Sequence, residues 1–337
     1  MLVPLKYTCF LSSQPTSIST TLLEQQYHRN TPGQLRVALR TTLSHSVTEK
    51  RSMKRTGIFF TYFQGARLKD FPQALDGILD KGNVSYYDAV YDSRDGLYYL
   101  APVSEELLLK VHSREMVQAV KLTGDYESAL YSAGGTVQTA DEIWQGKFDN
   151  AFVFTSFGDH HAGRNFYGGM CYFNGAALAI TALKEKGVKR FAIVDTDCHH
   201  ADGTRDIFGF DNDILHVCFC HQDYQDNHHN VDIRIPFRTS DEEYLTRVRQ
   251  EFVPRAEAFE PEYIFWEFGY DATQGEYGDK GLTRDCHRKL AQLIKGVADK
   301  VCHGRLITIL CGGSGRSLAT YIIPRIITCL AELGIYH

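Results

Sequence analysis

Short apolar runs bounded by turn residues and polar stretches recur along the chain after residue 53. Five of them are apolar at nearly every position: 151–155, 191–194, 214–219, 263–266 and 306–310. A strand that is covered on both faces has no polar side, so such runs predict buried strands of a parallel sheet. A similar run, 57–60, follows Met53 and predicts the first strand of the same sheet.

Amphipathic stretches of helical length lie between these runs. One begins after Ser104, a typical N-cap residue, and continues through Met116. The others span 173–186, 241–259, 283–300 and 317–333. Strands and helices in alternation predict one α/β domain, 53–337, in which helices cover both faces of a mostly parallel sheet.

The first 52 residues have a different composition. They contain fifteen Ser or Thr and six Lys or Arg, but only two acidic residues, Glu24 and Glu49. A Ser-rich, Arg-bearing leader with few acids is typical of organelle targeting peptides. We expect residues 1–52 to be a disordered or targeting extension, or the result of a start codon placed too early, and not to carry the chemistry.

Composition narrows the class of protein further. Of 337 residues, 43% are hydrophobic, which is enough for one large core and excludes wholesale disorder. The net charge of −5 gives no basis for direct nucleic-acid binding, and no run of 18 apolar residues predicts a membrane span. The nine cysteines are odd in number and scattered, which favours reduced thiols in an intracellular compartment, such as the cytoplasm, over disulfides.

Ligating side chains gather directly after the run 191–194. Asp195, Asp197 and His199 alternate along the chain, so extended backbone would point them to one side. Carboxylate oxygens and imidazole nitrogens in such a group are ligands for zinc, iron or manganese. Burying so many polar groups is costly unless a metal or hydrogen bonds compensate. The segment therefore predicts a metal site.

Two further strands end in polar residues. The run 151–155 is followed by the tandem pair His160 and His161, and the run 263–266 is followed by Asp271. Active sites of open α/β sheets lie beyond the carboxyl ends of the strands, where these residues would meet. Asp271 would be a third protein ligand beside Asp197 and His199, which leaves a coordination position for water.

Four motifs in a consistent order carry a family resemblance. They are Gly158-Asp159-His160-His161-Ala162, Gly169-Met170-Cys171-Tyr172-Phe173-Asn174, the segment 195–204, and Gly269-Tyr270-Asp271-Ala272 with the later glycine loop Gly312-Gly313-Ser314-Gly315. From about residue 53 to the C-terminus, the chain resembles the histone deacetylase and acetylpolyamine amidohydrolase family. The resemblance implies the three-layer α/β/α fold of the arginase–deacetylase type.

The resemblance also implies a role for each matched residue. Zinc, one ion per chain, would be bound by Asp197, His199 and Asp271. His160 would pair with Asp195 and His161 with Asp202, as acid–base groups. Gly169 would offer its carbonyl to the substrate amide, beside Met170 in the channel wall. Backbone oxygens of 195, 197 and 199 would bind a monovalent cation such as K⁺.

The activity implied is zinc-dependent hydrolysis, in which metal-activated water removes an acetyl group from acetyl-lysine or an acetylated polyamine. Two alternatives remain. One is a non-catalytic or slow acyl-binding member of the family, and the other is a ureohydrolase with two manganese ions, which would need further carboxylates near His160 and Asp271. The substrate would be an acetylated protein or a small acetylated amine.

The chain departs from the family pattern at the oxyanion. A family tyrosine follows the glycine loop, but here its place falls on Arg316 or Ser314, depending on the loop length of the template. Arg316 is the expected replacement, because a guanidinium is a permanently charged donor. A carboxylate such as Glu276 would have to balance it near a metal.

A separate group of cysteines and histidines gives a weaker prediction of a metal site. Cys218, Cys220, His228 and His229 have an unusual spacing for a structural zinc site, so buried strand thiols are the expected outcome.

Overall fold

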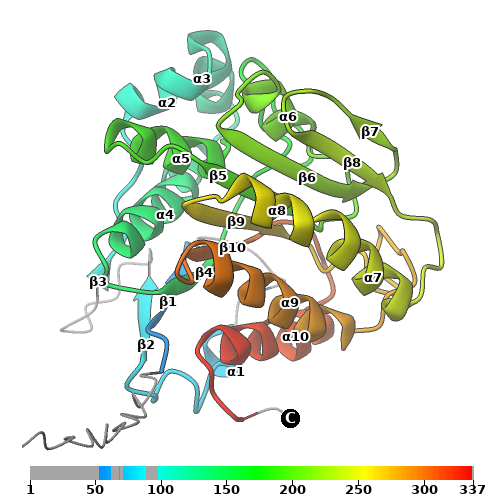
Figure 1. Ribbon diagram of the computed structural model, residues 1–337. Helices are drawn as coiled ribbons and strands as arrows, with labels where there is room; N and C mark the ends of the chain where they lie inside the picture. The colour runs from blue at the N-terminus through cyan, green and yellow to red at the C-terminus, as the bar shows by residue number, and fades with distance from the viewer. Residues whose placement is uncertain (1–52, 62–67, 69–70, 89–97, 336–337) are drawn as a thin grey trace, which may run out of the picture. The chain divides into compact units, whose positions relative to one another are not determined.

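A computed structural model describes residues 53–61, 68, 71–88 and 98–335 (Figure 1). Its centre is one ten-stranded sheet in the order β3-β2-β1-β4-β10-β9-β5-β6-β8-β7. Every pairing in it is parallel except that of β7 with β8. The expected extension 1–52 lies outside the described residues, so the domain boundary at 53 stays a prediction.

The strands include all six predicted from the apolar runs. Their bounds are β1 Thr56–Phe60, β2 Val84–Asp88, β3 Tyr98–Tyr99, β4 Asn150–Phe154, β5 Phe191–Asp195, β6 Ile214–Cys220, β7 Tyr224–Gln225, β8 Asn230–Arg234, β9 Tyr263–Phe268 and β10 Leu306–Leu310.

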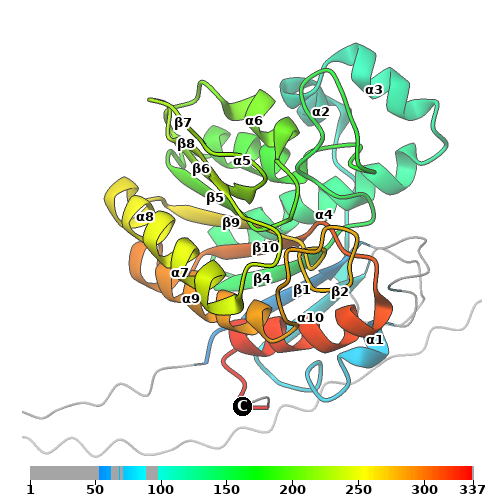
Figure 2. The ribbon, with the colours of Figure 1, turned by 90° about the vertical axis from the view of Figure 1, so that its right-hand side faces the viewer.

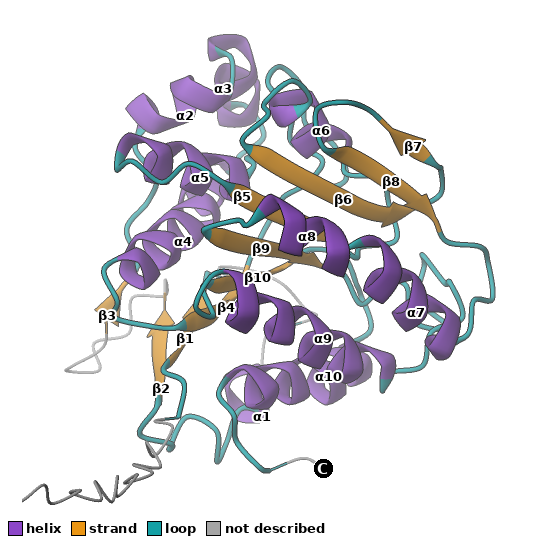
Figure 3. Cartoon of the chain, viewed as in Figure 1, coloured by secondary structure: helices purple, strands orange, loops and turns teal. Residues whose placement is uncertain are grey.

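Helices cover both faces of this sheet (Figures 2 and 3). One face packs against α2 Glu105–Val111, α3 Arg114–Lys121, α4 Tyr126–Trp144, α5 Gly175–Glu185 and α6 Asp202–Phe208. The other packs against α7 Asp241–Glu251, α8 Val253–Phe259, α9 Cys286–Val301 and α10 Arg316–Leu330, with α1 Phe71–Ala74 beside α10. Among the described helices, none has the length and apolar character needed to cross a membrane.

Two layers of helices explain why the strands are apolar at every position. Consecutive residues of a strand point to opposite faces. Val153 and Ile193 belong to the core on the α2–α6 side, whereas their neighbours Phe154 and Val194 belong to the core on the α7–α10 side. All four side chains are fully buried. The predicted three-layer architecture with a mostly parallel sheet is therefore confirmed.

Two predicted helices are each interrupted. The first ends at Val111, and a new helix begins after Ser113, whose hydroxyl caps it by accepting from the Met116 amide at 3.1 Å. The stretch 241–259 divides at Phe252, where Pro254 follows in the first turn of α8. Proline lacks an amide hydrogen and fits best in the first turn of a helix, which suits a helix boundary at this place.

Helix α4 was not predicted, because its small and polar residues give little amphipathic pattern. Its glycines have a packing reason. A Cβ at Gly134 would overlap the carbonyl oxygen of Ala101, so only glycine lets the helix approach the segment before α2 this closely.

Candidate metal centre and active site

The site is built at the carboxyl ends of four adjacent strands, β4, β10, β9 and β5. The loop after β4 carries His160 and His161, and β10 is followed by the glycine loop at Gly312. Asp271 follows β9, and the segment after β5 carries Asp197 and His199. Residues from four distant parts of the sequence therefore meet at one edge of the sheet, as the strand pattern predicts.

The three predicted metal ligands lie together. Nδ1 of His199 is 2.9 Å from Oδ1 of Asp197 and 3.1 Å from Oδ2 of Asp271. Cys198 was not predicted to take part, yet its Sγ lies 2.9 Å from Oδ2 of Asp271. Ligand atoms of these four residues are all within 4.8 Å of one another. We call this group the candidate metal centre.

The electrostatics of the candidate metal centre favour a cation. Both carboxylates are buried, and burial together with the charge of Asp197 raises the pKa of Asp271. Hydrogen bonds to Asp197 and then Asp271 raise the pKa of His199 to about 12. The two carboxylates therefore favour a positive charge between them. A metal ion in its place would satisfy both carboxylates and leave His199 neutral as a ligand.

Two glycines make room for the carboxylates of Asp197 and Asp271. A Cβ at Gly269 would lie 2.5 Å from Oδ2 of Asp197 and 2.5 Å from Oδ1 of Asp271. A Cβ at Gly312 would overlap the same two carboxylates, and the Gly312 amide donates to Oδ2 of Asp197 at 2.7 Å. The donor set and its glycine surroundings fit a divalent ion with oxygen and nitrogen ligands such as zinc.

Alanine at Gly269 is expected to displace these carboxylates and lower the metal content while most of the fold is kept. Gly296 in α9 is a matched control, because a Cβ there meets nothing within 4 Å. Metal analysis of Gly269→Ala and Gly296→Ala checks this, with circular dichroism to monitor folding. Full metal content in Gly269→Ala would show that the carboxylates need not hold their present positions.

His160 and its predicted partner are in contact in the buried part of the site. Nδ1 of His160 lies 2.7 Å from Oδ2 of Asp195, and its Nε2 lies 3.8 Å from Oδ1 of Asp197. Glu267 of β9 is the register partner of Asp195 on the adjacent strand. The sequence did not single it out, because it directly follows the apolar run 263–266 and is still part of the buried strand. Burial and the adjacent Asp195 raise the pKa of Glu267 well above its usual range. Burial also raises the pKa of Asp195, which accepts from the Asp197 amide at 2.9 Å.

His161 and its predicted partner are more accessible. Nδ1 of His161 lies 2.6 Å from Oδ1 of Asp202, and the side chains are 20% and 53% exposed. Partial burial opposes ionisation of Asp202, but the hydrogen bond with His161 lowers its pKa below the usual range. The two histidine rings are adjacent, with centroids 4.2 Å apart.

Gly169 lies against this partly exposed histidine, and Met170 follows it in the chain. A Cβ at Gly169 would be 2.5 Å from Cδ2 of His161, so glycine is required for the close approach. Gly169 and Met170 have φ of 53° and 62°, and Cys171 donates its amide to the Gly168 carbonyl at 2.7 Å. Positive φ at both central residues is typical of a type I′ turn. Met170 stands at its tip, 71% exposed.

Hydrogen bonds with the start of α5 and with Thr204 hold the loop that carries both histidines. Asp159 accepts from the amides of Gly175 and Ala176 at the start of α5, and the Thr204 amide donates to the His160 carbonyl at 3.0 Å. The buried His112 ring bridges the Gly163 carbonyl and the Asn174 amide. Burial lowers the pKa of His112 to about 4, which keeps it neutral in this role.

The glycine loop after β10 is held by two residues of the segment after Asp271. Glu276 accepts from the Ser314 amide and hydroxyl at 2.9 and 2.8 Å, and from the Gly315 amide at 2.6 Å. The Gly313 amide donates to the hydroxyl of Tyr277 at 2.8 Å. The Tyr277 ring stacks on His199, with centroids 5.8 Å apart and an angle of 27°. Tyr277 has no signal in the sequence that marks it as part of the site.

Arg316 is an exposed residue at the first position of α10, directly after Gly315. Tyr277 has a hydrogen bond into the glycine loop and a ring contact with the candidate ligand His199.

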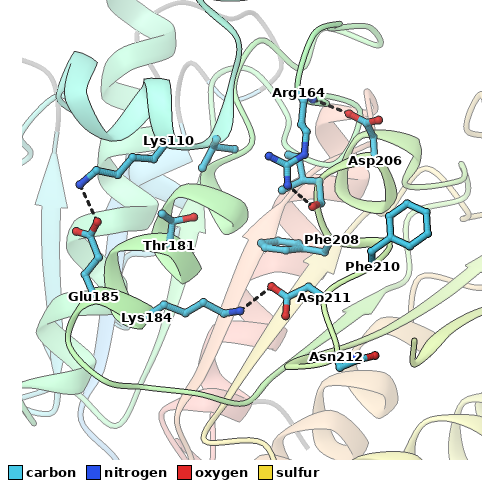
Figure 4. Close-up of a pocket in the computed structure, with 12 residues that line it drawn as sticks. Lys110, Arg164, Thr181, Lys184, Glu185, Asp206, Phe208, Phe210, Asp211 and Asn212 are labelled. Carbon is cyan, nitrogen blue, oxygen red and sulfur yellow. Dashed lines mark hydrogen bonds and ion pairs between the residues drawn. The ribbon is translucent and has the colours of Figure 1, made fainter. Parts of the chain in front are cut away.

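A separate hollow of about 710 Å³ lies between α2, α5 and α6 (Figure 4). The charged side chains that line it form ion pairs and hydrogen bonds with other lining residues. Lys110 pairs with Glu185 at 2.7 Å, Lys184 pairs with Asp211 at 2.6 Å, and Arg164 donates to the Ile207 carbonyl. None of its lining residues belongs to the candidate metal centre or the histidine pairs. This hollow is therefore separate from the candidate metal centre.

Comparison with known proteins supports one family. The family model of the histone deacetylase domain matches residues 122–327. A probable deacetylase of Archaeoglobus fulgidus is 28% identical over 295 residues, which cover 77% of this chain and 81% of the relative. The polyamine deacetylase HDAC10 of Mus musculus is 25% identical over 77% of this chain, which spans only 44% of that relative.

A solved structure shares the fold. The crystal structure of the HDA15 HD domain superposes with a TM-score of 0.68 at 22% identity, covering 84% of this chain and 91% of that one. The matched family model includes both histidine–aspartate pairs and all three predicted ligands, and it spans well over half of the chain. The chain therefore belongs to the histone deacetylase family.

Proposed function

We propose that this protein is a zinc-dependent amide hydrolase that removes an acetyl group from acetyl-lysine or from an acetylated polyamine. The observation that carries the proposal is the candidate metal centre lying beside two histidine–aspartate pairs. Zinc, held by Asp197, His199 and Asp271, would lower the pKa of a bound water and polarise the acetamide carbonyl.

The two histidines would carry out the proton transfers of the reaction. His160 is buried and lies nearer to Asp197, which suits a base that takes the proton of the attacking water. His161 is partly exposed beside Gly169, which suits an acid that protonates the departing amine. The carboxylate behind each ring orients it and raises its basicity. The products would be acetate and a free amine.

Replacing His161 by alanine is expected to lower turnover by a factor of about 10² or more, because acid–base assistance is lost. Metal content should remain at the wild-type level, since this histidine is assigned no coordination role. Steady-state kinetics on an acetyl-lysine peptide and metal analysis of the same sample check both statements. A variant that loses metal along with activity would make His161 a ligand instead.

Two residues are candidates for the donor that stabilises the oxyanion. Arg316 follows from the family resemblance, and Tyr277 follows from the contacts in the structure. We favour Tyr277, because its hydroxyl is positioned by the Gly313 amide and its ring rests on His199. A phenol has one donor hydrogen, and accepting from Gly313 does not use it.

The substrate would enter past Gly169 and Met170. The Gly169 carbonyl, next to His161, suits a hydrogen bond from the substrate amide, and the exposed Met170 suits contact with an aliphatic chain. Acetyl-lysine and an acetylated polyamine share that chain. Turnover of an acetyl-lysine peptide, compared with N-acetylated spermidine at equal concentration, distinguishes them. Metal bound without turnover of either would favour the acyl-binding alternative.

A monovalent cation such as K⁺ remains part of this proposal, with ligands from the backbone oxygens of 195, 197 and 199. Sγ of Cys218 lies 3.7 Å from the His199 carbonyl oxygen. Activity measured in potassium and in tetramethylammonium buffers tests the requirement.

A further inference from the structure

A second group of ligating side chains lies on the far side of β5 from the candidate metal centre. Cys218 and Cys220 are two residues apart on β6 and therefore share a face. Asp232 is the register partner of Cys218 on the adjacent β8, and His200 follows β5, the other neighbour of β6. One ligand atom from each of these four residues lies within 4.8 Å of all the others. We call this group the cysteine cluster.

The cysteine cluster does not use the histidines that the sequence offered as partners. His228 makes a 2.9 Å contact with the Asn212 side chain, and the His229 ring packs against Phe259. The sequence missed His200 and Asp232, because they reach Cys218 and Cys220 only through strand pairing.

The contact between His200 and Asp232 is longer than a hydrogen bond, although ligand atoms of both residues lie near Cys220. Nδ1 of His200 is 3.8 Å from Sγ of Cys220 and 3.6 Å from Oδ2 of Asp232. A nitrogen–oxygen hydrogen bond is shorter than about 3.2 Å. Around an ion with bonds of about 2.0–2.3 Å, however, ligand atoms at tetrahedral angles are roughly 3.3–3.8 Å apart. These two separations are close to those between ligands of one ion, and all four ligand atoms lie within 4.8 Å of one another.

The surroundings balance the charge of an occupied site. Two thiolates and one carboxylate would carry three negative charges, and a divalent ion would leave one. Nη2 of Arg205 lies 2.6 Å from Oδ1 of Asp232 and supplies the remaining positive charge. Gln222 donates to Oδ2 of Asp232 at 2.8 Å and fixes the oxygen that faces the cluster. Such outer hydrogen bonds orient metal ligands in known sites.

We propose that His200, Cys218, Cys220 and Asp232 bind a second zinc ion. Four protein ligands leave no position for substrate, so the site is structural. Two sulfur ligands favour zinc over magnesium or calcium, which prefer oxygen. The cysteines and Asp232 are buried, and His200 is partly exposed, which gives the ion a way in. The ion would join the ends of β5, β6 and β8, and would fix the backbone next to His199. This proposal is independent of the proposed function.

Metal analysis of the full chain tests it. The purified wild-type protein is expected to contain two zinc ions per chain, and Cys220→Ser and Cys218→Ser are expected to contain one. Asp271→Asn should also contain one zinc ion, because it loses the ion of the candidate metal centre. The double variant Asp271→Asn, Cys220→Ser should contain no zinc. Cys302→Ser is the matched control, a buried thiol outside both groups, and should keep two.

Cobalt(II) substitution identifies the ligands without relying on activity. Thiolate ligands give cobalt an intense charge-transfer absorption in the near ultraviolet, so the wild-type protein should show it, and Asp271→Asn should retain it. Cys220→Ser should weaken it strongly. One zinc per wild-type chain with no such absorption would overturn the proposal. So would an absorption that survives in Cys220→Ser but disappears in Cys198→Ser, since the sulfur ligand would then belong to the candidate metal centre.

Discussion

Asp197→Ala is expected to abolish turnover and to release the ion of the candidate metal centre. Asp197 offers Oδ1 toward His199, while its Oδ2 accepts from Gly312, so the substitution removes a ligand and the hydrogen bond that orients it. Three protein ligands are the usual minimum for a catalytic zinc site. Metal analysis after dialysis, and kinetics with and without added zinc, measure both effects.

The matched control is Asp80→Ala, which removes an exposed carboxylate and should change neither quantity. The isosteric Asp271→Asn separates loss of charge from loss of volume, and it should also release the ion. Full occupancy of the centre in Asp271→Ala would contradict the ligand assignment. Activity that stays lost in Asp197→Ala at saturating zinc is expected, because the geometry as well as the affinity is changed.

Tyr277→Phe is expected to lower kcat by a factor of about 10²–10³, the usual effect of removing one oxyanion donor. The ring and its stacking on His199 are kept, so metal binding should not change. A contact made only in the transition state lowers kcat and kcat/KM together. Steady-state kinetics over a range of substrate concentrations distinguishes this from weaker substrate binding.

The competing candidate is tested in parallel. Arg316→Ala should leave kcat within a few-fold of wild type if Tyr277 is the donor, because Arg316 is exposed at the start of α10. Wild-type kcat in Tyr277→Phe, together with a large loss in Arg316→Ala, would transfer the role to the guanidinium. Gly313→Ala is not a clean test of the loop, because its φ of 120° disfavours any other residue.

The sheet and the ligand-bearing segments could be predicted because their signals are local. Apolar runs at every position mark strands covered on both faces, and polar residues directly after them mark the carboxyl edge. For this reason the sequence predicts that Asp197, His199 and Asp271 lie together, and the structure brings them together. Helix α4 had no such signal, because its small residues serve close packing rather than an amphipathic face.

Residues that act through long-range contacts could not be predicted. Glu267 looks like one more position of an apolar strand, and only the register with Asp195 shows that it joins the buried acid pair. Tyr277 lies in a polar loop, and its link to Gly313 spans 36 residues. His200 and Asp232 likewise meet the two cysteines only after three strands have paired.

The strand order has a consequence for biosynthesis. β10, the last strand of the described residues, inserts between β4 and β9, which both leave the ribosome earlier. Until it arrives, β4 and β9 each have an unpaired edge, and such edges promote pairing with other chains. Contacts this distant in sequence also form slowly. The sheet therefore cannot be completed before residue 310 has been synthesised. Until then, the nascent protein most needs protection from aggregation.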